Sequence, residues 1–279
     1  MASILFGLLA SLSWGGGDFM GGLSSRRIGA ILAVFTSELF GLVLLLMAVP
    51  ILREPFPALP DLLIAFTSGL VGCLALLALY RALSTGKMSI AAPVSALLAA
   101  IVPIVIGAFI EGLPGWTKLL GFVFALGAVW LISNSEGDLR PHIQRLSDLR
   151  LPLLAGLGFG LYLVLINQVS SQIILWPMVS SRVGGCVVML VVLLTRHEKS
   201  TFTWKAWPLI VLNAAGDIGG NTFYILAGQA GRMDVAAVIS ALYPGATVFL
   251  AWLVLKERIS RWQLLGILSA LVAIALMTV

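Results

Sequence analysis

Polar side chains recur at helical spacing within one otherwise apolar segment, residues 205–228. Asn213, Asp217, Asn221 and Tyr224 follow one another at intervals of four, four and three residues, so in a helix all four side chains lie on one face. Hydrogen bonds between helices would account for the two asparagines alone. A carboxylate among apolar helices either binds a proton or faces water and a cation, so Asp217 favours a polar cavity over simple packing.

A second polar group lies near the start of the chain, where Trp14 and Asp18 are four residues apart and three glycines separate them. Two interpretations stay open. The glycines can break the helix, as at many transporter sites, and leave an aromatic ring beside a carboxylate to bind an amino or ammonium group. Equally, Gly17 and Gly21 form a GxxxG surface that only packs one helix against another.

Arg182 lies within the apolar run PMVSSRVGGCVVMLVVLL, residues 177–194. An arginine inside a membrane helix costs about 2.5–3.5 kcal/mol on insertion scales, so it needs a partner, a water-filled cavity or an escape to the surface. An internal repeat bears on that choice, because GKMSIAAPVSAL at 86–97 aligns with GRMDVAAVISAL at 231–242 at an offset of 145. Gly, Met and Ser match at fixed spacing, which favours a true duplication over chance similarity of apolar helices.

The repeat also relates Arg182 to an acid. Tyr80 and Tyr224 are 144 residues apart, and the same offset carries Arg182 back onto Glu38. We predict that Glu38 and Arg182 pair near the middle of the membrane, where the pair either gates a cavity or offers its charges to a zwitterionic solute. The alternative is that Arg182 reaches outward to the surface while Glu38 is protonated. Tyr80 is expected to face the polar stripe of 205–228.

The elements that must position these residues are membrane helices. The chain is 60% hydrophobic and only 10% charged, with a mean hydropathy of +1.07, which is typical of an integral membrane protein. Apolar runs of about 20 residues are long enough for helices to cross the bilayer. We expect an all-α fold with ten spans, at 3–23, 29–52, 60–83, 88–110, 115–133, 150–172, 174–195, 205–228, 234–255 and 260–279. Pro93, Pro103 and Pro244 are expected to kink spans four and nine.

The expected spans divide into two halves of five. A polar linker at 136–148 separates residues 1–135 from residues 149–279, and an odd number of spans per half makes the second repeat enter the membrane inverted. Of the 17 Lys and Arg residues, thirteen fall on the side reached after spans one, three, five, seven and nine, three fall on the other, and Arg182 lies within a span. The positive-inside rule therefore places both termini outside and the thirteen in the cytoplasm.

Other chemistries find little support. The net charge of +5 is explained by loops that face an anionic inner leaflet, so we expect no nucleic-acid partner. Cys73 and Cys186 lie within spans and receive no role. His142 and His197 have no paired ligand at metal-site spacing and no nucleophile beside them, and no ATP-binding loop is present. We therefore expect no metal, no cofactor and no enzymatic activity.

The most specific segments are ALSTGKMSIAAPVSALLAAIVPIVIG at 82–107 and ISALYPGATVFLAWLVLKERISRWQLLG at 239–266, supported by SLSWGGGDFMGGLSSRR at 11–27. With these segments the whole chain resembles the EamA-type transporters of the drug/metabolite transporter superfamily. The resemblance implies a ten-helix bundle whose two repeats line one central cavity and move small metabolites, often exporting amino acids. It implies no particular substrate. Glu38 departs from relatives, which often carry a neutral or basic residue in this segment.

We therefore expect a secondary transporter of the inner membrane that exports small metabolites such as amino acids by alternating access. A sugar or drug carrier of the same fold is the alternative within transport. A membrane scaffold or receptor is the alternative from another class, and it would show no solute-dependent flux. Asp18, Glu38 or Asp217 is expected to carry a coupling proton if protons drive transport.

Overall fold

The computed structural model describes residues 1–85, 88–133, 149–195, 203–256 and 258–278, and it leaves aside the side chains of residues 80, 81, 83–85 and 88–93. Within this part of the chain every regular element is a helix. The helices are α1 (Ala2–Ile28), α2 (Ala30–Leu52), α3 (Leu59–Thr85), α4 (Met88–Ile110), α5 (Trp116–Ser133), α6 (Arg150–Val169), α7 (Leu175–Thr195), the short 3₁₀ helix η2 (Trp204–Ala206), α8 (Trp207–Gln229), α9 (Met233–Ser240), α10 (Tyr243–Leu255) and α11 (Arg261–Thr278).

Eight segments of the described chain are long and apolar enough to cross a membrane. They correspond to the expected spans except for those over 3–23 and 88–110. Residues 3–23 lie in α1, whose serines, glycines and Asp18 make it less apolar than the others. In α4, the side chains described begin at Val94, and the stretch Val94–Ile110 is apolar. The all-helical membrane architecture is thus confirmed, whereas the count of ten spans stays a prediction.

The ninth expected span is two helices rather than one. Helix α9 ends at Ser240, and α10 begins at Tyr243 with Pro244 in its first turn. Proline lacks a backbone N–H, and its ring clashes with the carbonyl four residues earlier, which here belongs to Ser240. Pro103, in contrast, lies inside α4 without interrupting it, and the side chain of Pro93 lies outside the described residues.

Helix α1 runs without a break through Gly15, Gly16 and Gly17, so the interpretation of the first span as a broken helix is wrong. Inside a bilayer, an unwound segment would leave backbone groups without hydrogen bonds, which outweighs the poor helix propensity of glycine. The glycines instead let α8 approach. A Cβ atom at Gly17 would lie 3.2 Å from the Asn213 carbonyl oxygen and 3.3 Å from the carbonyl carbon of Gly216.

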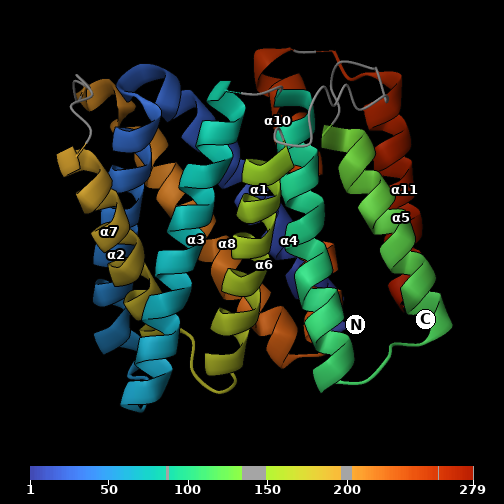
Figure 1. Cartoon of the computed structure of the whole chain (residues 1–279), viewed down its shortest axis with the longest axis horizontal. Helices are drawn as coiled ribbons and strands as arrows, with labels where there is room; N and C mark the ends of the chain where they lie inside the picture. The colour runs from blue at the N-terminus through green and yellow to red at the C-terminus, as the bar shows by residue number, and fades with distance from the viewer. Residues whose placement is uncertain (86–87, 134–148, 196–202, 257, 279) are drawn as a thin grey trace.

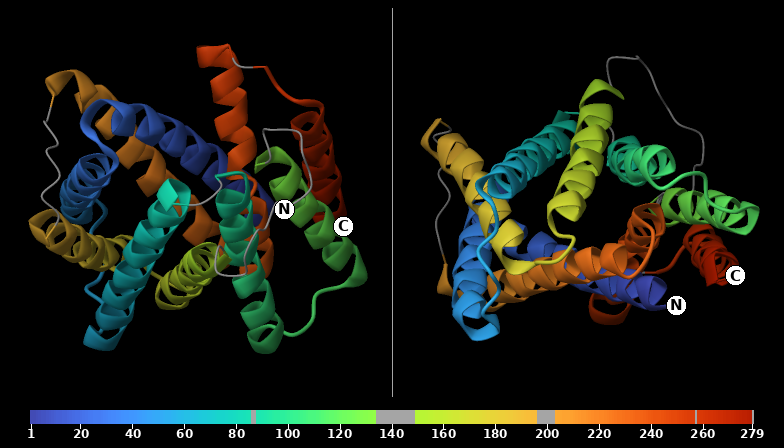
Figure 2. Two further views of the ribbon diagram at one scale, coloured as in Figure 1. Left: turned by 45° about the horizontal axis from the view of Figure 1, so that its top comes forward. Right: turned by 90° about the horizontal axis from the view of Figure 1, so that it is seen from below.

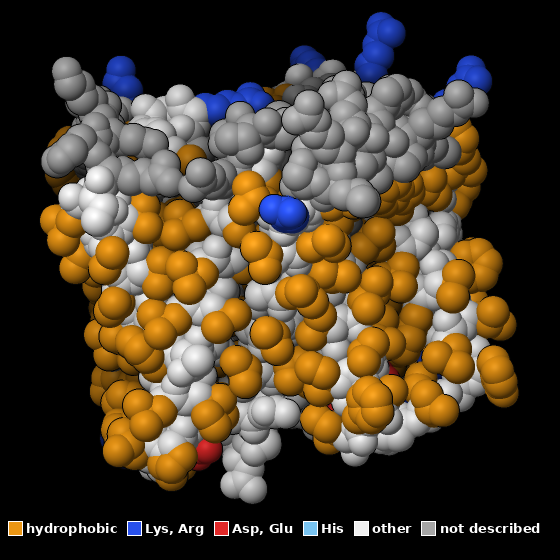
Figure 3. All heavy atoms as spheres, in the orientation of Figure 1, with side chains coloured by type: hydrophobic (Ala, Val, Ile, Leu, Met, Phe, Trp, Pro, Cys, Tyr) orange, Lys and Arg blue, Asp and Glu red, His pale blue; other side chains and the backbone are white. Residues whose placement is uncertain are grey.

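The helices run between two ends of the molecule, and both termini lie toward the same end (Figure 1). Helix α1 packs along α8, α3 along α6 and α5 along α11 (Figure 2). Figure 3 shows apolar side chains over most of the height of one face, with Lys and Arg gathered at one end and Asp and Glu visible only near the other. This distribution is what a multi-pass membrane protein needs, because apolar surface meets lipid and charge meets water.

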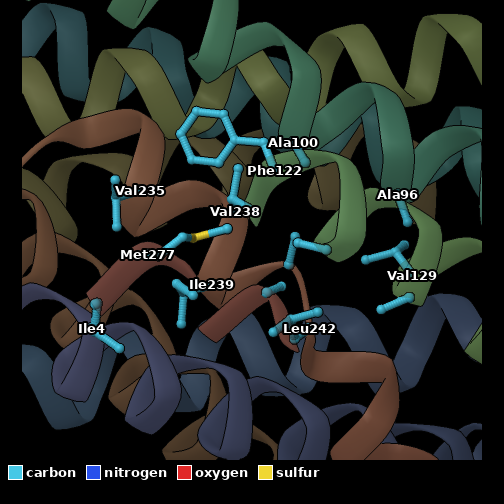
Figure 4. Close-up of a cluster of buried hydrophobic side chains, with 14 of the residues drawn as sticks. Ile4, Ala96, Ala100, Phe122, Val129, Val235, Val238, Ile239, Leu242 and Met277 are labelled. Carbon is cyan, nitrogen blue, oxygen red and sulfur yellow. The ribbon is translucent and has the colours of Figure 1, made fainter. Parts of the chain in front are cut away.

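One apolar core joins α5 and α11 to the rest of the bundle. Phe122 and Val129 of α5 meet Met277 of α11 and Val238 and Ile239 of α9, all of them buried (Figure 4). This core leaves the polar residues of α1, α2, α7 and α8 to a separate region between the two halves of the chain.

Candidate functional site

A cavity of about 580 Å³ lies between the two halves of the chain. It is lined by residues of α1, α2, α3, α4, α6, α7, α8 and α10. The polar and aromatic side chains of this lining are Trp14, Asp18, Ser24, Ser25, Ser37, Glu38, Ser95, Phe159, Tyr162, Ser181, Arg182, Asn213, Asp217, Asn221 and Tyr243. Seven of the nine side chains that the sequence singled out, all except Tyr80 and Tyr224, therefore meet in one space.

Arg182 lies at the centre of the polar network. Its side chain is buried, with 7% of its surface exposed, and one guanidinium nitrogen lies 2.8 Å from Glu38 Oε1. The predicted contact is therefore present, and the alternative in which Arg182 reaches outward to the surface is wrong. Glycines on the facing helices make room for the pair, since a Cβ atom at Gly185 would lie 3.0 Å from a carboxylate oxygen of Glu38.

Arg182 also pairs with Asp217 of α8, a contact that the sequence analysis did not predict. The repeat relates Arg182 to Glu38 alone, because Asp217 has no acidic counterpart at the same offset. A signal was nevertheless present. One arginine and several carboxylates lie within apolar segments, and membrane-embedded charges are found paired with one another.

The polar stripe of α8 serves both packing and the cavity. Asn213 donates a 2.8 Å hydrogen bond to the Gly17 carbonyl oxygen and accepts one from Ser37, which ties α8 to α1 and α2. Asn221 accepts a 2.6 Å hydrogen bond from the Tyr162 hydroxyl and donates to the Asp217 carbonyl oxygen at 2.8 Å. Both asparagines line the cavity, so their remaining polar surface faces its interior.

Tyr224, the last member of the stripe, lies outside the cavity lining. It is fully buried, and its hydroxyl donates to the Leu163 carbonyl oxygen at 3.0 Å. Its ring lies 5.9 Å from that of Trp14, so it packs against a residue of the cavity lining. The side chain of Tyr80, its repeat mate, lies outside the described residues.

On α1, Trp14 and Asp18 both face the cavity. The Trp14 ring meets the Tyr243 ring edge-on, with centroids 6.5 Å apart and planes at 80°. Asp18 is exposed to the cavity and makes no hydrogen bond or ion pair with any residue in the described part of the chain. Helix packing by the glycines and exposure of Trp14 and Asp18 thus occur together on one unbroken helix.

Tyr162 and Tyr243 were missed by the sequence analysis. Each lies in an ordinary helical context, LGFGLYLVL for Tyr162 and ISALYPG for Tyr243. Tyr162 has no polar neighbour at helical spacing, and those of Tyr243 are two small hydroxyl residues, Ser240 and Thr247, which also occur where helices simply pack. Only the proline after Tyr243 was informative, because a helix break inside a membrane is tolerated where it lines a cavity.

The cavity extends toward one end of the bundle. Its lining includes Ser25 in the last turn of α1, Ala30 at the start of α2 and Leu79 near the end of α3. The last turn of α1 also carries Arg26 and Arg27, so this is the end where Lys and Arg gather. Toward the other end, buried apolar side chains close the space, among them Ile166 and Ile225 together with Tyr224.

Two polar contacts fasten the closed end. The Glu54 carboxylate, in the loop after α2, accepts hydrogen bonds from the backbone N–H groups of Ile174 at 3.1 Å and Leu175 at 2.7 Å. These groups begin α7, where the helix dipole favours a negative charge. The Trp176 ring packs on Phe56 with centroids 4.8 Å apart, so this loop of the first half is attached to the second.

The second contact centres on Arg232, between α8 and α9. Its guanidinium donates to the fully buried Asp234 carboxylate at 2.6 Å and to the Gly112 carbonyl oxygen at 2.6 Å. The Met233 N–H donates to the Glu111 carboxylate at 3.0 Å. The hydrogen bonds to Asp234 hold the pKa of the Arg232 guanidinium above its usual range, so the guanidinium stays charged in this contact. We call this contact the Arg232 lock.

No cluster of three or more His, Cys, Asp or Glu side chains suited to a metal ion occurs among the described residues. The described lining offers hydroxyl, amide, carboxylate and aromatic groups, which suit the reversible binding of a small molecule.

Comparison with known proteins gives a consistent result. The model of the EamA-like transporter family matches residues 1–134 and 149–279. A solved crystal structure, described only as that of a protein, superposes with a TM-score of 0.85 over 100% of this chain and 99% of its own, at 13% identity. It is one of 29 matching chains of solved structures, and at that identity it shows a shared fold. No curated protein matches. Since the family model covers nearly the whole chain, the chain belongs to the EamA-like transporter family.

Proposed function

We propose that the protein is a secondary transporter that exports small metabolites, such as amino acids, through the central cavity by alternating access. The observation that carries this proposal is a polar cavity between the two halves that extends to one end of the bundle while buried side chains and two polar contacts close the other. A scaffold or receptor needs neither a polar space at this depth nor a closure on one side only.

The packing of the helices supports an inverted repeat of two five-helix halves. Helix α2 packs on α7, α4 on α9 and α5 on α11, each an element against its counterpart in the other half. Helix α6 is the counterpart of α1, and α8 is the counterpart of α3. The contact of α1 with α8 therefore has its equivalent in the contact of α6 with α3, as expected for a twofold axis in the membrane plane. Rocking such halves about their shared axis would open the cavity to each side in turn.

The network around Arg182 supports protons as the coupling ion. Arg182 contacts two carboxylates, Glu38 and Asp217. Protonation of either one still leaves the buried guanidinium with an anionic partner, so the cavity can take up and release a proton without an unpaired buried charge. In a single ion pair, protonation of the one carboxylate would leave the buried guanidinium without an anionic partner.

One-sided access is testable without knowledge of the solute. Ala99 of α4 lines the cavity, and both native cysteines are free. In a Cys73→Ser, Cys186→Ser background, Ala99→Cys is expected to react with a membrane-impermeant maleimide mainly from the Lys- and Arg-rich side. Comparison of intact cells with inside-out vesicles measures this. Equal labelling from both sides in every condition, or no labelling at all, would contradict the proposal.

The solute class is tested by growth. Cells that express the protein are expected to survive higher concentrations of toxic amino acid analogues than cells with an empty vector, because export lowers the internal concentration. Resistance confined to toxic sugars or drugs would replace the amino-acid class with the alternative carrier. Resistance to none, together with a cavity that never changes sides, would favour a scaffold.

A further inference from the structure

We propose that the cavity selects solutes of net positive charge and binds their ammonium group between the Asp18 carboxylate and the rings of Trp14 and Tyr243. This inference rests on the transport function proposed above and narrows its solutes. Among amino acids it favours those with a cationic side chain over those that are zwitterions without net charge. It separates amines and other organic cations from zwitterions and anions of the same size.

The first step is the balance of charge. Among the described lining residues, Asp18, Glu38 and Asp217 are acidic and Arg182 is the one cation. When all four are ionised, the described lining carries three negative charges against one positive charge, a net of two negative charges. Low-dielectric walls strengthen this field inside the cavity, so a cation is attracted and an anion is repelled.

The second step concerns Arg182, which would be the natural site for a solute carboxylate. Its guanidinium is already engaged on both sides, by Glu38 at 2.8 Å and by Asp217. A bound carboxylate would have to displace one of these acids, which would then lie unpaired beside a second anion inside the cavity, and this is costly. The carboxylate of a zwitterionic solute therefore finds no free cationic partner among the described lining residues.

The third step is the state of Asp18. It is exposed to the cavity, and within the described part of the chain it makes no hydrogen bond or ion pair. Asp18 and Tyr243 line the same cavity. Trp14 lies one turn earlier on the same face of α1, so carboxylate and indole are presented to the same space.

The two rings are fixed in place before a solute arrives. Trp14 packs on Tyr224, which is fully buried, and Gly220 leaves no space between the indole and the α8 backbone. Tyr243 begins α10 directly after the break in the ninth span. Aromatic faces attract a cation within about 6 Å of the ring centroid, most strongly where water is excluded. Because the centroids of Trp14 and Tyr243 are 6.5 Å apart, one ammonium group can lie within that range of both.

Binding of three matched compounds tests the inference. The probes are 2-phenylethylamine, phenylalanine and 3-phenylpropanoate, which share a phenyl side chain and differ in charge at neutral pH. Thermal unfolding of the purified full-length protein in detergent, titrated with each probe, reports their apparent affinities. We expect the amine to bind about tenfold more tightly than the other two. Equal or tighter binding of phenylalanine or 3-phenylpropanoate, or no binding of the amine, would overturn the inference.

Variants locate the site. Asp18→Asn keeps the size of the side chain and is expected to lower amine affinity about tenfold or more, because only the charge is lost. Tyr243→Phe is expected to retain most of the affinity, and Tyr243→Leu to lose several-fold. Asp61→Asn, which removes a carboxylate at the start of α3 outside the cavity, is the matched control and should bind like the parent.

Parent-like amine binding by Asp18→Asn would overturn the assignment of the ammonium site. The proposed transport function is tested independently of this inference, because the labelling of Ala99→Cys needs no solute. A cavity that is accessible from one side but prefers phenylalanine would refute the charge selection alone.

Discussion

At the scale of single residues, Arg182 differs from an arginine in a simple ion pair in the number of its acidic partners. It has two acidic partners, Glu38 and Asp217, so the loss of one acid leaves the guanidinium paired. The loss of the arginine leaves two carboxylates that are only partly exposed and no longer share a cation, and like charges close together are costly.

We therefore predict an ordering of stabilities. Glu38→Gln and Asp217→Asn should each lower the melting temperature slightly, whereas Arg182→Gln should lower it by more, because both carboxylates lose their shared cation and repel each other. Thermal unfolding of the purified variants in detergent gives the ordering. The double variant Glu38→Gln, Asp217→Asn strands the buried arginine itself, which costs about 3–5 kcal/mol, so it should be destabilised more than either single acid variant. Equal stability of all four proteins would mean that these contacts contribute nothing.

A second prediction concerns function at the same network. Asp217→Asn keeps the shape of the side chain and removes its ionisable proton, so it is expected to abolish or uncouple transport while the protein stays folded. The measurement is flux of the solute identified by the growth screen, in vesicles with and without an imposed pH gradient. Parent-like flux with a parent-like response to the gradient would show that the stripe on α8 only packs helices.

At the scale of elements, the crossing of α1 and α8 sets the position of the cavity residues on both helices. A Cβ atom at Gly216 would lie 2.7 Å from the Cα of Gly17 and 2.8 Å from the Ser13 carbonyl oxygen. Backbone atoms cannot move aside as a flexible side chain can. The two helices would have to separate, and Asp217, the next residue, would shift with them.

Gly216→Ala is therefore predicted to destabilise the protein by about 1–3 kcal/mol, the usual cost of overpacking. Gly16→Ala is the matched control on the facing helix, because a Cβ there meets only Leu250 Cδ1 at 3.9 Å. It should be neutral or slightly stabilising, since alanine favours helix more than glycine. The comparison of the two melting temperatures decides the matter, and a neutral Gly216→Ala would mean that the α1–α8 contact is looser than the structure describes.

Most of the helices could be predicted from the sequence, because apolar runs of span length form helices wherever water is excluded. The pairing of Glu38 with Arg182 could be predicted too, since the repeat offset supplies a spatial relation that periodicity alone lacks. The second acid on Arg182 and the hydrogen bond from Tyr162 to Asn221 could not, because they depend on how α6, α7 and α8 pack. The break at Ser240 and the continuity of α1 depended on whether backbone hydrogen bonds could be satisfied locally, which proline prevents and glycine permits.

At the scale of the whole molecule, the two ends differ in charge and in closure. The cavity reaches the end that carries Arg26 and Arg27, which the positive-inside rule assigns to the cytoplasm. The opposite end is fastened by Glu54 on α7 and by the Arg232 lock. Both contacts join a loop of the first half to a helix start of the second, so the proposed rocking of the halves would require both to separate.

The Arg232 lock yields the last prediction. Removal of the guanidinium in Arg232→Gln leaves Asp234, whose side chain is fully buried, without its partner. An unpaired buried carboxylate destabilises the closed arrangement relative to one in which water reaches it, so the population should shift toward opening at this end. In the Ala99→Cys labelling assay, reaction from the side opposite to the Lys- and Arg-rich end is expected to rise several-fold.

The double variant Arg232→Gln, Asp234→Asn removes the stranded charge as well as the lock, so its labelling should fall between those of the parent and the single variant. Lys118→Gln removes a cation at the same end that makes no hydrogen bond or ion pair within the described part of the chain, and it should label like the parent. If Arg232→Gln is folded and labels no faster than Lys118→Gln, the contact does not hold this end closed, and the apolar cluster around Tyr224 alone separates the cavity from the far side.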